Sequence, residues 1–154
     1  MKVYQIHSKQ VLPISMEAAW EFLSDPKNLE LITPPDMKFT ILGDLHGRKT
    51  YAGQIINYRI SPFKGITMSW TTEISHCQNQ EYFVDEQRFG PYTFWHHKHF
   101  LKKIEGGVLM EDIVDYALPF GILGQFAHWL FVRKKLKKIF NYRTEAVRAL
   151  FSNQ

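Results

Sequence analysis

Apolar and polar residues alternate along several stretches of the chain, which is the pattern of β-strands with one buried face. The alternation is clearest over residues 66–75, where Trp70 shares its face with isoleucine, methionine and threonine, while serine, threonine and glutamate fill the other face. Three more strands are predicted between residues 83 and 118, where turn signals separate alternating segments. The remaining strands are expected over 2–12, 37–42 and 50–60.

Apolar residues spaced three and four apart predict two short helices and one long helix. The short helices are expected over 16–23, with Ser15 as the N-cap, and over about 27–31. The long helix is expected over about 122–151, after Pro119 ends the last strand. One strand, two short helices, six strands and a long helix form an α+β pattern. It predicts a strongly bent antiparallel sheet wrapped around the C-terminal helix.

The three strands between residues 83 and 118 are joined by tight turns at Gly90-Pro91 and Gly106-Gly107. Turn length fixes which residues share a face. The first turn places Asp85 opposite His97 and Phe83 opposite His99. A two-residue turn at Gly106-Gly107 places His97 opposite Tyr116 and His99 opposite Val114. The inner face is predicted to hold Phe83, Asp85, Gln87, Trp95, His97, His99, Leu101, Met110, Asp112, Val114 and Tyr116.

This inner face is unusually polar for a core, since buried carboxylates and imidazoles are costly unless they are paired. Asp85 with His97 is one predicted pair, and Asp112 with His99, along a diagonal, is the other. Such a face is either a closed hydrogen-bonded network or the lining of a pocket.

The long helix has two halves with different patterns. Projected at about 100° per residue, Ile122 and Trp129 share one apolar stripe with the later core positions, and Arg143 falls inside this stripe. The opposite side carries the basic residues Lys134, Lys137 and Lys138. The first two turns are apolar nearly all round. Either this start lies under neighbouring loops, or it is an exposed apolar patch beside a basic cluster, which would mark a membrane surface or a partner site.

The composition sets few further limits. The 154 residues suffice for one domain over 1–154, and the 15% of aromatic residues favours large side chains around a cavity. Cys77 is the only cysteine, which excludes an internal disulfide and a cysteine-based zinc site. Because the N-terminus lacks an apolar signal core and the apolar run 116–132 is short for a membrane span, a cytoplasmic location is expected.

The order of elements, with FVDEQRFGPYTFWHHKHF followed by DIVDYALPFG and a long terminal helix, resembles the START/Bet v 1-like SRPBCC superfamily. More narrowly, the chain resembles small bacterial proteins related to polyketide cyclases/dehydrases and coenzyme-Q-binding chaperones. The shared pattern falls on Phe83, Asp85, Gln87, Gly90, Pro91, Tyr92, Trp95, His97, His99, Asp112, Val114, Tyr116, Leu118 and Pro119. The resemblance covers essentially the whole chain. It implies a helix-grip fold with a deep cavity, in which the superfamily binds lipids, quinones, sterols and polyketides and a minority catalyse reactions.

Other chemistries have weaker support in the sequence. His96, His97 and His99 look like a metal-binding cluster, but neighbouring residues alternate faces, so only His97 and His99 can converge. No metal or other cofactor is therefore predicted. No nucleophile elbow or phosphate-binding loop occurs. The basic run over 133–138 comes without a nucleic-acid-binding motif, so no nucleic acid partner is predicted.

We therefore predict a protein that binds a hydrophobic or amphipathic small molecule, such as a lipid, quinone or polyketide, as a monomer or weak dimer. The expected ligand-binding residues combine apolar walls with a few polar groups. They are Trp70, Asp85, Gln87, Trp95, His97, His99, Asp112, Tyr116, Phe126 and Trp129.

Two alternatives stay open at this point. The first is a cyclase or dehydratase that uses His97 as its base, with Asp85 behind it. The second is a module that docks on a membrane or a partner through the last helix. A structural reading is open as well, in which Asp85, Gln87, His97 and Tyr116 satisfy one another's hydrogen bonds without any activity.

Overall fold

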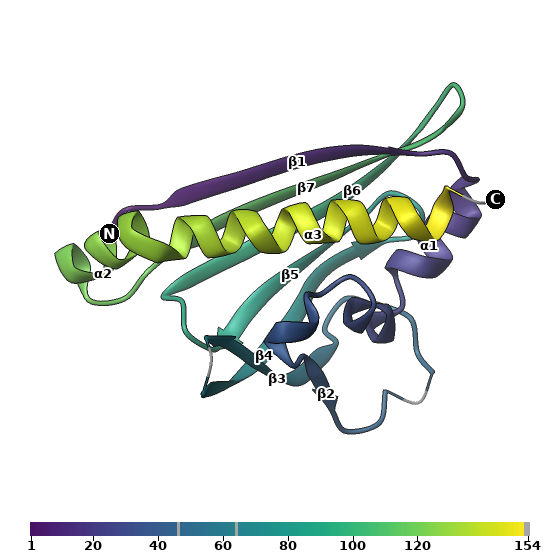
Figure 1. The fold of residues 1–154 in the computed structure, drawn as a ribbon. Helices are drawn as coiled ribbons and strands as arrows, with labels where there is room; N and C mark the ends of the chain where they lie inside the picture. Colours follow the sequence, from purple (N-terminus) through teal and green to yellow (C-terminus); the bar gives the residue numbers. More distant parts are fainter. Residues whose placement is uncertain (46, 64, 153–154) are drawn as a thin grey trace.

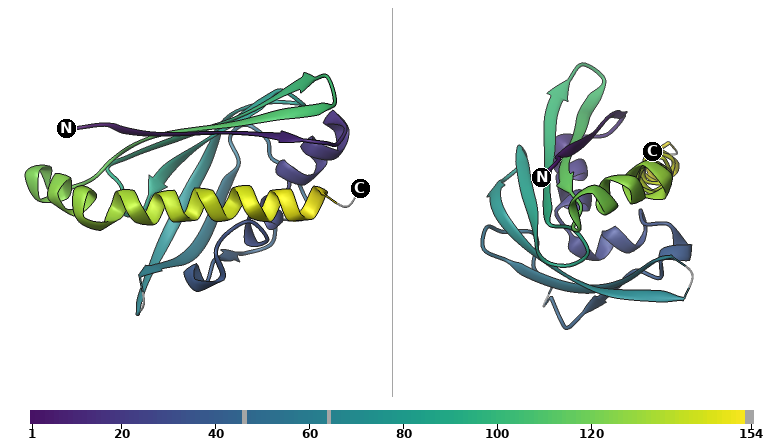
Figure 2. Two further views of the ribbon diagram at one scale, coloured as in Figure 1. Left: turned by 45° about the horizontal axis from the view of Figure 1, so that its top comes forward. Right: turned by 90° about the vertical axis from the view of Figure 1, so that its left-hand side faces the viewer.

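A computed structural model of the chain describes residues 1–45, 47–63 and 65–152. The described residues form seven strands: β1 (Tyr4–Leu12), β2 (Thr40–Leu42), β3 (Ile55–Phe63), β4 (Ile66–Gln78), β5 (Tyr82–Phe89), β6 (Phe94–Ile104) and β7 (Gly107–Ala117). They make one antiparallel sheet in the order β1-β7-β6-β5-β4-β3-β2. Figures 1 and 2 show this sheet bending around the long C-terminal helix. The predicted α+β helix-grip architecture is confirmed.

The first short helix lies beside the C-terminal end of the long helix (Figure 1), and the last one, through Asp36, lies 3.3 Å from Lys135 near the start of α3 (Arg133–Phe151). The short helices are α1 (Met16–Leu23) and the 3-10 helices η1 (Pro26–Glu30) and η2 (Pro35–Met37). The Ser15 hydroxyl accepts a hydrogen bond from the Ala18 amide at 3.1 Å, so Ser15 is the N-cap and α1 begins at Met16, as predicted. The core at this end is apolar and closed, with α1, β1 and β7 packed against the end of the last helix. Its buried residues are Leu12, Ile14, Ala19, Ile32, Leu101, Val108, Met110, Val147 and Phe151.

The register between β5 and β6 agrees with the turn-based prediction, since Asp85 pairs with His97 and Phe83 pairs with His99. The predicted register between β6 and β7 is wrong by two residues. His97 lies opposite Val114, and His99 lies directly opposite Asp112. A shift of two residues leaves every side chain on its predicted face, because faces alternate with a period of two.

Gly107 explains the shift. The turn is Glu105-Gly106, and Gly107 is already in the β7 ladder, paired with Ile104. Gly106 has a φ of +82°, as the turn requires. A Cβ atom on Gly107 would lie 2.0 Å from the carbonyl oxygen of Leu12 in β1. The second glycine therefore serves the close approach of β1 and not the turn.

The predicted last helix is divided by a π turn. It consists of α2 (Gly121–Ala127), the π-helical η3 (His128–Val132) and α3 (Arg133–Phe151). A π turn holds about one residue more than an α turn, so it rotates the preceding helix faces by roughly 100° relative to a regular helix. Consequently Ile122 and Trp129, predicted on the buried stripe, are 83% and 73% exposed. Among the described residues, no helix is both long and apolar enough to cross a membrane.

Candidate functional site

A cavity of about 450 Å³ lies between the concave face of the sheet and the last helix. Its walls come from β3 to β6, from the 3-10 helices and from α2, η3 and α3. Most of the lining side chains are apolar or aromatic, with a small polar group at one part of the wall. Both the volume and this mixture are typical of small-molecule sites, which span roughly 300–1,000 Å³.

Aromatic side chains form one wall around Trp70. The Trp70 ring stacks on Tyr58 at 5.8 Å between centroids and meets Trp95 edge-on at 5.2 Å. The Trp70 Nε1 donates to the Thr72 hydroxyl at 3.1 Å, and the Tyr58 and Thr72 hydroxyls are 2.9 Å apart. Burial raises the pKa of Tyr58, so its phenol stays neutral. The polar atoms of this wall are thus satisfied within it, and the surface offered to the cavity is apolar.

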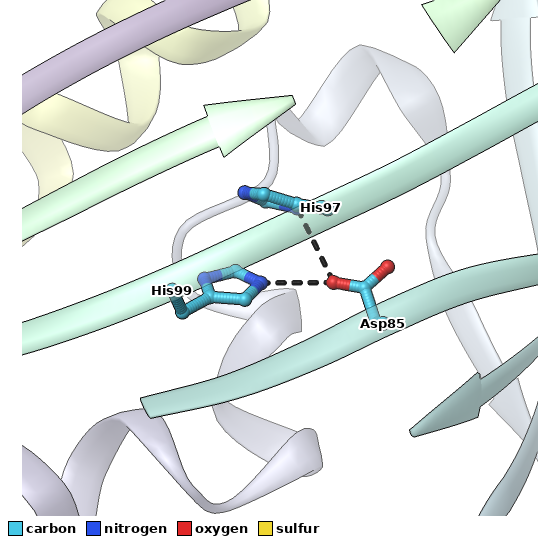
Figure 3. A group of neighbouring side chains, drawn as sticks. All are labelled: Asp85, His97 and His99. Carbon is cyan, nitrogen blue, oxygen red and sulfur yellow. Dashed lines mark hydrogen bonds and ion pairs between the residues drawn. The ribbon is translucent and has the colours of Figure 1, made fainter. Parts of the chain in front are cut away.

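Four polar residues from β5, β6 and β7 form a closed cluster next to the cavity, and Figure 3 shows three of them. Asp85 Oδ2 lies 2.8 Å from His99 Nε2 and 3.3 Å from His97 Nδ1. Asp112 Oδ1 lies 3.1 Å from His97 Nε2 and 2.7 Å from His99 Nδ1. Each imidazole therefore contacts both carboxylates. We call Asp85, His97, His99 and Asp112 the Asp-His cluster.

The charges of the Asp-His cluster follow from this geometry. Burial by itself would raise the pKa of Asp85 and Asp112, but contacts with the two imidazoles hold both values well below the usual range. Burial by itself would lower the pKa of His99, but its bonds to Asp112 and Asp85 raise that pKa instead. The cluster thus combines two carboxylates with the His99 imidazolium. Arg143 Nη1, 3.7 Å from Asp112 Oδ1, adds a second positive charge.

This arrangement limits the chemistry of the cluster. All four histidine ring nitrogens face carboxylate oxygens, so neither ring offers a free lone pair to a molecule in the cavity. Arg143 differs, because it lines the cavity, is 14% exposed and contacts a carboxylate only at 3.7 Å. Its guanidinium retains N–H donors that can reach an acceptor oxygen in the cavity.

A metal ion is the other species that such residues could hold. Within the described residues, Asp85, His97 and His99 offer ligand atoms that all lie within 4.8 Å of one another. Two histidines and one carboxylate are a ligand set that first-row transition metals accept. The guanidinium of Arg143, 3.7 Å from Asp112 Oδ1, places a positive charge close to this point, however, and opposes a cation there. The absence of a metal stays a prediction.

The structure brings together about half of the predicted site residues. Trp70, Asp85, Trp95, His97 and His99 line the cavity. Asp112 is 1% exposed and lies behind the two histidines, where it completes the Asp-His cluster without lining the main cavity.

Gln87 and Tyr116 have other partners. The Gln87 amide donates to the Tyr92 carbonyl at 2.6 Å and accepts from the Tyr92 amide at 3.1 Å, which fixes the loop between β5 and β6. Tyr116 is buried, and its hydroxyl lies 2.9 Å from His128 Nε2. Neither side chain joins the Asp-His cluster or lines the cavity, so the predicted network that included both does not form.

Phe126 and Trp129 were expected in the cavity wall, but both side chains lie exposed on the outer surface. The cause is the π turn, which rotates this segment relative to a regular helix. The residues that η3 and α2 turn toward the cavity are Gly124, Ala127, Phe131 and Val132.

Many cavity residues were not predicted as ligand-binding, and two aromatic ones show why. Tyr58 follows the alternation of Ile56 and Ile60 on the inner face of β3, so the period-two pattern contained a signal for it. Tyr92 lies in the loop before β6, where no periodic pattern marks its direction. Arg143 was marked by its place on the apolar stripe of the last helix, and it points toward the cluster instead of extending to solvent.

No protein-family model matches the sequence, and no curated protein matches it. The fold does match solved structures over nearly the whole chain. Protein CV1439 from Chromobacterium violaceum is 12% identical, with a TM-score of 0.73 and 96% of each chain covered. Ginseng major latex-like protein 151 from Panax ginseng is 12% identical, with a TM-score of 0.68 and 97% of each chain covered. Protein TTHA0849 from Thermus thermophilus is 15% identical, with a TM-score of 0.64, covering 96% of this chain and 99% of that one.

Proposed function

We propose that this chain, which has the helix-grip fold of the START/Bet v 1-like proteins, binds a hydrophobic or amphipathic small molecule in the cavity between its sheet and α3. The observation that carries the proposal is the cavity itself, about 450 Å³ in volume and walled mainly by apolar and aromatic side chains. Burying the apolar part of a ligand there would release water from both surfaces, which is the main source of affinity in such sites. A lipid, a quinone or a polyketide meets this description.

The polar part of the wall adds a preference among such ligands. Arg143 carries N–H donors with no close carboxylate partner, since its distance to Asp112 is 3.7 Å. A ligand with a carbonyl, carboxylate or other acceptor oxygen would satisfy these donors. The Asp-His cluster would hold Arg143 in place from behind, because its carboxylates attract the guanidinium. The ligand would then lie with its acceptor oxygen near Arg143 and its apolar part against Trp70 and Trp95.

The cyclase or dehydratase alternative has less support. A general base needs a lone pair within hydrogen-bond reach of the substrate. Both ring nitrogens of His97 are already engaged by Asp85 and Asp112. Binding without catalysis is therefore the preferred function. The cytoplasmic location stays a prediction that rests on the sequence, including the single free cysteine, Cys77.

Filling the cavity tests the proposal. Ala127 lines the cavity, so Ala127→Phe would place a phenyl ring inside it. Ala149, an exposed residue on α3, provides the matched control Ala149→Phe. Native mass spectrometry of protein purified from its own host would show a retained ligand as added mass. Titration with 1-anilinonaphthalene-8-sulfonate, an amphipathic probe with an anionic group, would measure the affinity of the purified protein.

In the wild type and in Ala149→Phe we expect the added mass of a retained ligand and saturable binding of the probe. In Ala127→Phe both signals should be lost while the circular dichroism spectrum is unchanged. Equal probe affinity in the two variants, or wild-type protein that neither retains mass nor binds the probe, would contradict binding in this cavity.

A further inference from the structure

The outer face of α2 and η3 carries a dense group of exposed apolar side chains. Each of them is more than half exposed, although most are large and one is a tryptophan. They are Phe120, Ile122, Leu123, Phe126, Trp129 and Leu130, and we call them the apolar patch. Figures 1 and 2 show this segment at one end of the molecule, beside the N-terminus. Contiguous exposed apolar surface of this kind marks a binding face.

Positive charge adjoins the apolar patch. The first turns of α3 expose Arg133, Lys134, Lys137 and Lys138. The sequence contains no aspartate or glutamate between Asp115 and Glu145, so no acidic residue of this segment offsets them. Among the described residues, Lys134 and Lys137 have no acidic partner, while Lys138 lies 3.9 Å from Asp36. An apolar face bordered by exposed lysines is complementary to the interface of an anionic bilayer.

The backbone at Phe120 supports a binding role for the patch. Phe120 has a φ of +65°, a left-handed conformation in which glycine would be unstrained. Its side chain is nevertheless large and 82% exposed, so it gains little packing within the chain. A strained, exposed aromatic residue is explained if its ring is buried by something outside this molecule.

The inner side of the same segment borders the cavity. Phe120 and Phe131 line the cavity and are exposed, so they belong to its rim. Phe63 of β3, also exposed and lining the cavity, packs edge-on against Phe131 with centroids 5.6 Å apart. The rim of the cavity and the apolar patch are thus two sides of one helical segment.

We propose that the apolar patch inserts into the interface of an anionic lipid bilayer, with Lys134 and Lys137 against the lipid phosphates. Docked in this way, the molecule would hold the Phe63–Phe131 rim close to the acyl chains. An apolar ligand could then pass between bilayer and cavity without crossing water. This last step rests on the proposed function, whereas docking itself does not.

Co-sedimentation with vesicles tests the charge part of the proposal. We expect the full chain to bind phosphatidylcholine vesicles that contain phosphatidylserine, and to bind pure phosphatidylcholine more weakly. Lys134→Gln with Lys137→Gln should weaken binding to the anionic vesicles by roughly thirtyfold. The matched control is Lys102→Gln with Lys103→Gln, which removes two exposed charges near the β6–β7 turn at the other end of the molecule. This control should bind like the wild type.

Two further variants test the apolar part. Phe120→Gly should lower vesicle binding while the melting temperature stays the same or rises, because glycine relieves the left-handed backbone. Tryptophan fluorescence should shift to shorter wavelength on anionic vesicles, and Trp129→Phe should remove that shift. The filled-cavity variant Ala127→Phe should still dock, which separates a failure of ligand binding from a failure of docking.

Several results would overturn the proposal. One is the absence of vesicle binding at low salt. Another is wild-type binding by both the Phe120→Gly variant and the double lysine variant. A third is a stable dimer in sedimentation velocity that buries Trp129 without lipid, since the patch would then serve a second copy of the chain.

Discussion

Replacing Asp112 by asparagine would test whether charge holds the Asp-His cluster together. The Asp112 side chain is 1% exposed, and its Oδ1 lies within 3.7 Å of His97, His99 and Arg143. Asn keeps the shape and removes the negative charge. His99 then keeps Asp85 as its remaining carboxylate partner in the cluster, and Arg143 loses its contact with the Asp112 carboxylate. Removing one partner of a buried ion pair costs about 3–5 kcal/mol. At about 2–4 °C per kcal/mol for a chain of this size, the melting temperature should fall by roughly 6–20 °C.

The pH dependence of the stability lost in Asp112→Asn shows whether the loss comes from the charge of the side chain or from its packing. The pKa of His99 is raised above its ordinary 6.5, so its contribution to stability is complete below pH 6.5 and is lost as the pH rises through the folded value. The pKa values of Asp85 and Asp112 are lowered from 3.8, so their contribution is present above that pH and is lost as the pH falls. The cluster therefore stabilises the wild type most between about pH 4 and pH 6.5.

Urea denaturation of the wild type and Asp112→Asn at pH 5.5, 7 and 9 would measure this difference. The difference in the free energy of unfolding between the wild type and Asp112→Asn should be largest at pH 5.5. It should be smaller at pH 9, because a smaller fraction of His99 is positively charged there and can attract the Asp112 carboxylate. Asp115→Asn is the control on the same strand, because Asp115 pairs with Lys98 at 2.7 Å but is partly exposed. Its cost should be about 1 kcal/mol or less. A difference that is the same at every pH, or no larger than that of the control, would refute the reasoning.

Three more substitutions give clear expectations for stability, each measured by urea denaturation. Gly107→Ala should prevent stable folding, because its Cβ would lie 2.0 Å from the Leu12 carbonyl oxygen, whereas Gly106→Ala meets open space and should cost about 1 kcal/mol for its left-handed backbone. Equal stability of the two alanine variants would contradict this account of the turn. Tyr116→Phe removes the hydroxyl that lies 2.9 Å from His128 Nε2 and should lower the free energy of unfolding by about 1 kcal/mol. An unchanged value would mean that this contact contributes nothing.

The sheet was the more predictable half of the molecule, because side-chain parity tolerates errors of two residues. His97, His99 and Asp112 lie on the predicted inner face although the register between β6 and β7 was shifted. The pairing within that face was less predictable. Whether Asp112 lies diagonal to His99 or directly opposite it depends only on which residues form the turn between β6 and β7. Glycine is favoured both in a turn and where two backbones approach closely. The sequence Gly106-Gly107 therefore does not reveal which glycine forms the turn and which allows the close approach.

The last helix was less predictable for a different reason. A helical projection assumes one angle per residue along the whole segment, and the π turn breaks that assumption at His128–Val132. Phe126, before the turn, and Trp129, inside it, were therefore assigned to the wrong side. The exposed alternative for this segment was open from the sequence, because a helix start that is apolar all round does not indicate by itself which side is covered.

The number of residues in the π turn sets how the faces of α2 are oriented relative to those of α3. Deleting one residue from η3 would restore a regular helix and turn the faces of α2 by roughly 100° relative to α3. A single three-nucleotide deletion would thus exchange the surface shown at this end of the molecule, while α3 keeps its contacts with the sheet. Proteins of this fold that differ by this one residue would present different faces from equivalent helices. Aligning them without a gap at the π turn would match exposed positions with buried ones.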